Sequence, residues 1–70
     1  MNKDQVIGNW EQLKGNVRKE WGKLTDDHVA QVKGDRQILA GQIQESYGVA
    51  KEEADEQIDR WEKANRKNAA

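Results

Sequence analysis

The chain carries one sequence pattern twice, with the two copies 26 positions apart. The first copy reads Leu13-x-Gly15-x-Val17-x-x-x-Trp21-Gly22, and the second reads Leu39-x-Gly41-x-Ile43-x-x-x-Tyr47-Gly48. An acidic pair follows each copy, Asp26-Asp27 in the first and Glu52-Glu53 in the second. Such a repeat predicts two similar units within one small domain, each made of a helix, a turn and the start of the next helix.

Apolar residues in the first part of the chain recur every three or four positions, which is the spacing of one helix face. The residues on this stripe are Val6, Trp10, Leu13, Val17, Trp21 and Leu24. They predict a helix from about residue 3 to 21, with Asn2 and Gln5 as a partial capping box and Gly22 ending it as a left-handed residue. Because proline is absent and no run alternates between apolar and polar residues, no strand is predicted.

The next helix start is marked by Thr25, whose hydroxyl is typical of an N-cap, followed by two aspartates at the positive end of the helix dipole. Helical spacing then continues through Val29, Val32, Leu39, Ile43 and Tyr47. Arg36 occupies one position where this spacing calls for an apolar residue. Gly34-Asp35 is expected to bend or break the stretch into two helices, and Gly48 is expected to end it.

The last helix is predicted from about Lys51 to Asn65, with acidic residues first and basic residues last, as the helix dipole favours. Its inner face contains Ala54, Ile58 and Trp61. Ion pairs four residues apart are predicted for Glu56–Arg60, Asp59–Lys63 and Glu62–Arg66. Residues 65–70 are expected to fray.

These elements predict an all-α fold, a small bundle of three to four helices with an internal two-fold sequence repeat, in a single domain over residues 1–70. The three tryptophans and Tyr47 are expected to anchor its core. Gly15 and Gly41 lie inside helical patterns, where glycine costs about 1 kcal/mol relative to alanine. Either two helices approach closely at these positions, or both are tolerated surface glycines.

Composition restricts both the compartment and the partners. Charged residues make up 36% of the chain, yet the net charge is only −1, so no strong field points toward nucleic acid or a membrane. Cysteine is absent, which rules out disulfides and thiolate metal sites. The first residues contain no apolar signal-peptide core, and no run approaches the length of a transmembrane helix. A soluble cytoplasmic protein is therefore expected.

The chain offers little for catalysis. Ser46, Thr25 and His28 are the single serine, threonine and histidine, so no nucleophile and base combination is indicated. Adjacent carboxylates on a helix point about 100° apart, so neither acidic pair forms an acid–base dyad or converges on a metal ion. No catalytic, cofactor-binding or metal-binding residue is predicted, and the protein is expected not to be an enzyme.

Four basic residues form a candidate binding face near Trp10 and Trp21: Lys14, Arg18, Lys19 and Lys23. Basic groups beside aromatic rings are typical of single-strand nucleic-acid binding. The competing interpretation places both tryptophans in the core and the basic side chains in solvent, and the apolar stripe and net charge favour it. Mixed charges on the first helix disfavour a membrane. Weak self-association, or binding of a protein partner at an exposed tryptophan, remains an open alternative. The sequence identifies no particular partner.

Two segments of the chain resemble the CsbD-like family of small bacterial stress proteins. Residues 14–27 read KGNVRKEWGKLTDD, and residues 34–48 read GDRQILAGQIQESYG. The likeness extends over roughly residues 3 to 61. Asn16 and Ala40 stand where the family commonly has lysine, so this chain is less basic than many relatives. The resemblance implies a helical bundle made under general, osmotic or stationary-phase stress, with no enzymatic activity and no agreed binding residue.

The resulting hypothesis is a non-enzymatic bacterial stress-response protein. The chain also resembles hydrophilins, which are glycine-bearing, strongly hydrophilic and associated with water deficit. This likeness suggests protection of other macromolecules as water is lost. The alternative is a small regulatory binding module that contacts nucleic acid or a protein through the Lys14–Lys23 face or an exposed tryptophan.

Overall fold

The segments with helically spaced apolar residues form four α-helices in the computed structural model. The structure describes residues 7 and 10–69, with side chains as far as residue 65. The helices are α1 (Trp10–Glu20), α2 (Asp26–Val32), α3 (Arg36–Tyr47) and α4 (Lys51–Ala69). No strand occurs over these residues. The all-α prediction is therefore confirmed, and the higher of the two expected helix counts is correct.

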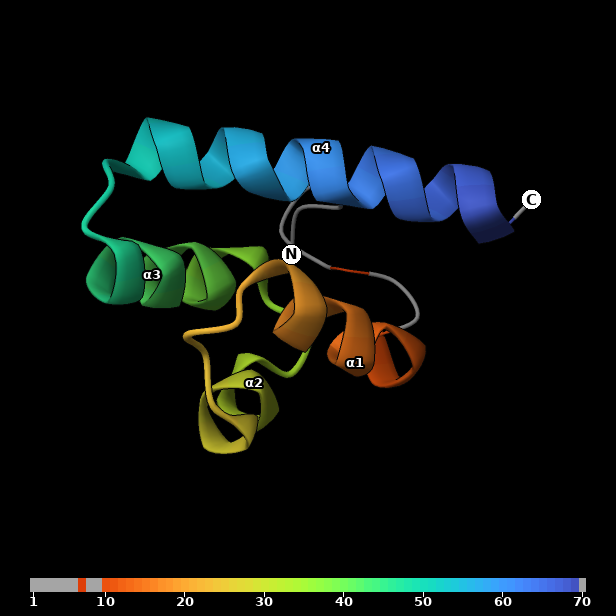
Figure 1. Ribbon diagram of the computed structural model, residues 1–70, viewed down its shortest axis with the longest axis horizontal. Coiled ribbons are helices and arrows are strands. Elements are labelled where there is room, and N and C mark those ends of the chain that lie inside the picture. The colour runs from red at the N-terminus through yellow and green to blue at the C-terminus, as the bar shows by residue number, and fades with distance from the viewer. Residues whose placement is uncertain (1–6, 8–9, 70) are drawn as a thin grey trace.

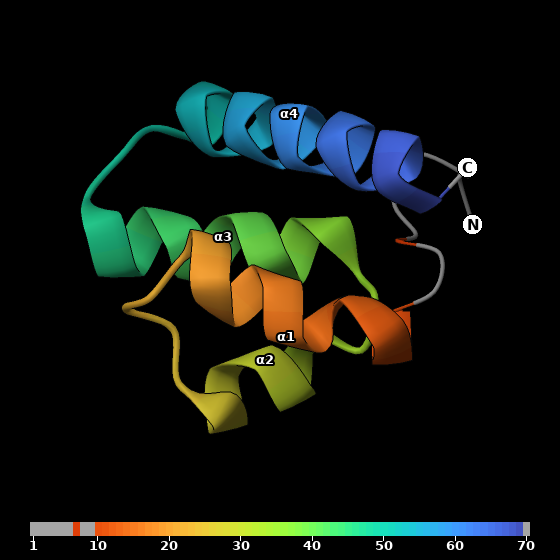
Figure 2. The same ribbon diagram turned by 45° about the vertical axis from the view of Figure 1, so that its right-hand side comes forward.

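The four helices form a layered arrangement in which α4 and α2 lie on opposite sides, with α1 and α3 between them (Figures 1 and 2). The short connection after Tyr47 turns the chain back, so that α3 and α4 run in opposite directions side by side (Figure 1). These two helices share the most extensive helix–helix contact of the fold. Helix α2 packs on α3 and α1 from the other side.

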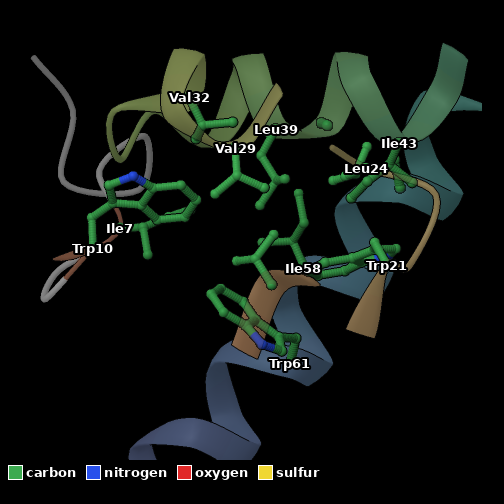
Figure 3. Packing of buried hydrophobic residues seen from close by; sticks show 13 residues of the cluster. Ile7, Trp10, Trp21, Leu24, Val29, Val32, Leu39, Ile43, Ile58 and Trp61 are labelled. Atoms are coloured by element: carbon green, nitrogen blue, oxygen red, sulfur yellow. The ribbon is translucent and has the colours of Figure 1, made fainter. Parts of the chain in front are cut away.

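All four helices and the segment before α1 contribute to one apolar core (Figure 3). Its buried residues are Ile7, Trp10, Val17, Trp21, Leu24, Val29, Val32, Leu39, Ala40, Ile43, Ala54, Ile58 and Trp61. The three tryptophans are buried as predicted. Tyr47 and Leu13 are only partly buried and pack against the edge of the cluster. Ile38 is the one exposed large apolar side chain among the described residues.

The break between α2 and α3 results from two consecutive left-handed residues. Lys33 has a φ of 51° and Gly34 a φ of 82°, which no helix accommodates. Asp35 then caps α3, because its carboxylate accepts hydrogen bonds from the backbone N–H groups of Gln37 at 2.8 Å and Ile38 at 3.4 Å. The break predicted at Gly34-Asp35 is confirmed.

The predicted start of the first helix is wrong. Helix α1 begins at Trp10 rather than near residue 3, and Ile7 lies outside any helix. The backbone N–H of Ile7 donates to the carbonyl of Gly34 at 2.7 Å, and its side chain is buried. This long-range hydrogen bond competes with helix formation at Ile7 and fixes Ile7 on the α2–α3 turn. The predicted cap at Asn2 and Gln5, and Val6 of the apolar stripe, lie outside the described residues.

The predicted role of Gly22 is also wrong, whereas that of Gly48 is confirmed. Gly48 has a φ of 67° and its N–H donates to Gln44 at 2.9 Å, so it ends α3 in the left-handed conformation. Gly22 has no positive φ. The chain leaves α1 through a turn in which Leu24 N–H donates to the Trp21 carbonyl at 3.0 Å. That turn directs Leu24 into the core, and no left-handed residue is needed.

Thr25 caps α2 as predicted, but its partner was missed. The Thr25 hydroxyl accepts from the His28 N–H at 3.1 Å, and His28 Nδ1 accepts from the Thr25 N–H at 3.3 Å. His28 thus takes the place of the glutamate or glutamine of an ordinary capping box. The single histidine of the chain has a structural role at the first turn of α2.

Gly15 and Gly41 are tolerated surface glycines, and no close approach of helices explains them. A Cβ built on either residue would meet nothing within 4 Å. Gly34 differs, because its Cβ would lie 3.3 Å from the carbonyl oxygen of Ile7. The turn at Gly34 therefore needs glycine both for its backbone conformation and for the close approach of Ile7.

Alanine substitution should separate the two kinds of glycine. Gly41→Ala should raise the free energy of unfolding by about 0.5–1 kcal/mol, because alanine favours the helix and the added methyl group has free space. Gly48→Ala should lower it by about 1–2 kcal/mol, because a Cβ is strained at this positive φ. Urea unfolding followed by far-UV circular dichroism measures both. A loss of stability in Gly41→Ala would contradict this assignment.

Truncation of Trp21 should remove most of the stability of so small a domain. The side chain is fully buried, so Trp21→Ala should lower the free energy of unfolding by about 3–5 kcal/mol. Ile38→Ala is the control, since Ile38 is 43% exposed, and its effect should stay within about 0.5 kcal/mol. Urea unfolding measures both variants. Equal losses of unfolding free energy would show that Trp21 is not a core residue.

Candidate functional site

The four basic residues of the predicted binding face do not form a single surface. Lys14 pairs with Glu11 on the same helix at 3.2 Å, and Arg18 pairs with Asp26 at the start of α2. Arg18 and Lys19 are adjacent on α1 and so point about 100° apart. Lys19 turns toward α4, where it lines a groove with residues of that helix. The structure therefore divides the face between two sides of α1.

Lys23 is held by Tyr47 in the turn after α1. Its backbone N–H donates to the Tyr47 hydroxyl at 3.0 Å, and its ammonium nitrogen lies 5.1 Å from the centroid of the tyrosine ring. A cation over an aromatic face at this distance is attracted by the ring. Lys14, Arg18 and Lys23 thus already have partners within the chain. Nucleic-acid binding by these four residues stays a prediction.

The α1–α4 groove is an open depression of about 530 Å³ between the second half of α1 and the middle of α4. Lys19 and Glu20 line it from α1, and Arg60 lines it from α4. Trp61 also lines it, although the residue is only 5% exposed. Two cations from different helices therefore share one groove with a single carboxylate.

Aromatic rings and a chain of hydrogen bonds fix the α4 side of this groove. Trp21 and Trp61 meet edge to face, with ring centroids 5.5 Å apart (Figure 3). Trp21 Nε1 donates to Gln57 Oε1 at 2.8 Å, and Gln57 Nε2 donates to Glu53 at 3.2 Å. Glu53 in turn lies 3.7 Å from the Arg60 guanidinium. The buried Trp21 indole is thus connected to the cation at the groove.

Asparagines connect the two walls at another point of the groove. Asn16 Nδ2 on α1 donates to Asn65 Oδ1 on α4 at 2.9 Å, and Asn65 Nδ2 donates to the Trp61 carbonyl at 2.8 Å. By contrast, the indole Nε1 of Trp61 is buried without a hydrogen-bond partner among the described residues. A buried donor without a partner costs about 1–3 kcal/mol.

Arg36, which interrupts the apolar spacing, connects α3 to α4. Its guanidinium contacts Asp59 at 2.6 Å and Glu62 at 2.9 Å, and the Glu62 side chain is 15% exposed. Partial burial by itself would lower the pKa of Arg36. The hydrogen bond to Asp59 and the charges of Glu62 and Asp59 outweigh it, so the pKa lies above its ordinary value. Asp59 and Glu62 thus bind across helices.

The ion pairs expected within α4 need correction accordingly. Arg60 pairs with Glu53 rather than with Glu56. The Arg66 side chain lies outside the described side chains, so the Glu62–Arg66 prediction stays open, as does Asp59–Lys63. At the start of α4, Lys51 bonds Asp55 at 2.8 Å, and this hydrogen bond and the Asp55 charge raise the pKa of Lys51. Both of these pairs lie within α4, and the Arg60–Glu53 pair spans two helical turns rather than one.

The described part of the chain contains neither a metal-binding cluster nor a membrane-spanning helix. No three His, Cys, Asp or Glu residues there are close enough to hold a metal ion. None of the described helices is both long enough and apolar enough to cross a membrane. A smaller polar hollow of about 280 Å³ lies between α2 and α3, and Gln42 contributes to its lining.

Comparison with known proteins shows to which family the chain belongs. The model of the CsbD-like family matches residues 4–56. The chain belongs to the CsbD-like family. The similarity predicted from the two sequence segments is thereby confirmed. The family is one of general stress proteins that are generally non-catalytic.

Relatives of this CsbD-like chain are similar along nearly their whole length. The UPF0337 protein YjbJ of Escherichia coli O6:H1 is 52% identical over 63 residues, which cover 90% of this chain and 91% of the relative. A UPF0337 protein of Pectobacterium atrosepticum is 52% identical over 62 residues, covering 89% and 90%. One from Protochlamydia amoebophila is 44% identical over 57 residues, covering 81% and 86%. Their names state no activity or partner.

Removal of the interhelical arginine of this CsbD-like protein should cost more than removal of an exposed one. Arg36→Ala should lower the free energy of unfolding by about 1–2 kcal/mol, since it removes the hydrogen bond to Asp59 and leaves the largely buried Glu62 without the Arg36 cation. Arg18→Ala breaks only an exposed pair and should cost at most about 0.5 kcal/mol. Urea unfolding at low and high salt measures both, and a larger effect of Arg18→Ala would refute the assignment.

Proposed function

We propose that this CsbD-like protein protects other macromolecules when water is lost, by a physical effect rather than by a reaction. The observation that carries the proposal is the contrast between interior and surface. The described large apolar side chains are buried or packed at the core edge, with Ile38 as the exception. Charged residues make up 36% of the chain and are nearly balanced in sign, and none of those that the structure describes is buried.

This contrast supports protection through a simple mechanism. A surface without a large apolar patch gives other proteins no site for hydrophobic aggregation. Dense charges of both signs retain water and keep the surface hydrophilic as solutes become concentrated. Molecules of this kind separate labile proteins from one another during drying. Membership in a general stress family agrees with such a role.

A drying assay tests the proposal. A labile enzyme is dried and rehydrated with this protein, and its recovered activity is compared with that after drying with an equal mass of an unrelated small protein. Recovery should be several-fold higher with this chain, because its surface carries more charge and less exposed apolar area. Equal recovery with the two additives would refute protection.

A matched variant shows whether charge density is the cause. Six exposed residues of α4 are replaced by alanine: Lys51, Glu52, Glu53, Glu56, Arg60 and Lys63. Three are basic and three acidic, so the net charge stays at −1, and alanine preserves the helix. Far-UV circular dichroism checks the fold of the variant. Loss of protection would support the charged surface as the cause, and unchanged protection would contradict it.

The geometry gives less support to a regulatory module that binds through the Lys14–Lys23 face. Three of the four cations have partners within the chain, and Lys19 points to a different side from Arg18. The tryptophans are buried, so they offer no ring for stacking on bases. A titration with single-stranded DNA at about 50 mM salt tests the module where phosphate contacts are strong.

A further inference from the structure

We propose that the α1–α4 groove is a binding site for a small oxyanion of the phosphate or carboxylate type, held between Lys19 and Arg60. The proposal is independent of the protective function, because protection needs only the surface as a whole. It rests on the placement of the two cations, on the hydrogen-bonding groups around them and on the size of the groove.

The first argument is that both cations have donors to spare. Lys19 forms no ion pair within the described part of the chain, unlike its neighbours Lys14 and Arg18. The ion contact of Arg60 is with Glu53 at 3.7 Å, which is longer than a hydrogen bond. An ammonium carries three donors and a guanidinium five, and neither can accept. Unused donors on two walls of one groove are matched by an acceptor-only ligand, which is an oxyanion.

The second argument is that the groove is pre-organised. The Trp21–Gln57–Glu53 hydrogen bonds lead from the core to Arg60, and the Asn16–Asn65 bond joins the two walls. The groove lining at Asn16, Gln57 and Asn65 is therefore set before a ligand arrives, which lowers the ordering cost of binding. Trp61, whose indole N–H has no partner, lies in the same lining.

The third argument concerns size and charge. A groove of about 530 Å³ accepts an ion as large as a tricarboxylate. The lining contains two cations, Lys19 and Arg60, and one carboxylate, Glu20, so its net charge is +1. The whole chain, by contrast, has a net charge of −1. Because the groove is open to solvent, water and salt screen these charges, and binding should be weak, with a Kd on the order of 1 mM.

The test is a titration of the full-length protein with sodium phosphate and, separately, sodium citrate, at constant ionic strength maintained with sodium chloride. Indole N–H and backbone N–H signals are followed by NMR. Saturable shifts are expected at Trp61 and Lys19 with at least one of the two probes. Absence of saturable shifts with both probes, or shifts equal to those caused by chloride, would overturn the proposal.

Charge variants on the two walls give opposite expectations. Lys19→Gln and Arg60→Gln should each weaken binding about tenfold, because each removes a charge-assisted contact. Glu20→Gln should strengthen it several-fold, because it removes the repelling carboxylate. Lys63→Gln is the matched control, since it removes a cation from α4 outside the groove lining. An unchanged Kd in Lys19→Gln, or an equal loss in Lys63→Gln, would reduce the effect to unspecific surface charge and refute the site.

Discussion

The contact between Trp21 and Trp61 is the interaction on which the rest of the structure depends. The two rings meet edge to face at 5.5 Å and join the end of α1 to the middle of α4, two segments far apart in the chain. Without cysteine, no covalent link is available to a domain this small. Aromatic pairs of this geometry add about 0.5–1.5 kcal/mol beyond the area they bury. Trp21 also bonds Gln57 and so orders the surface above the core.

Local signals in the sequence were sufficient for most of the fold. The apolar spacing predicted the burial of the tryptophans, and the residue types at Thr25, Gly34 and Gly48 predicted a cap, a break and a helix end. Ile7 and Arg36 depart from the apolar periodicity for one shared reason, which is a partner distant in the sequence. Ile7 leaves the helical pattern to bond Gly34, and Arg36 replaces an apolar residue to bind Asp59 and Glu62. No periodicity along one segment reveals such partners.

The candidate site was predictable only in part. Lys19 was singled out with its basic neighbours, but their proximity in sequence concealed that α1 divides them between two sides. Arg60 was considered only as a partner for α4 residues, and its place opposite Lys19 depends on how α4 crosses α1. One signal was available: Gln57 precedes Trp61 by one helical turn and Arg60 is its direct neighbour, so both border the face that α4 buries.

The central claim is that this hydrophilic chain forms one cooperative helical domain with its indoles inside. Urea unfolding observed in parallel by intrinsic tryptophan emission and far-UV circular dichroism tests it most directly. In dilute buffer the emission maximum should lie well to the blue of free indole in water, and both signals should change in one coincident transition. Emission like that of free indole without any transition would show a chain that is disordered in water, and would contradict the account.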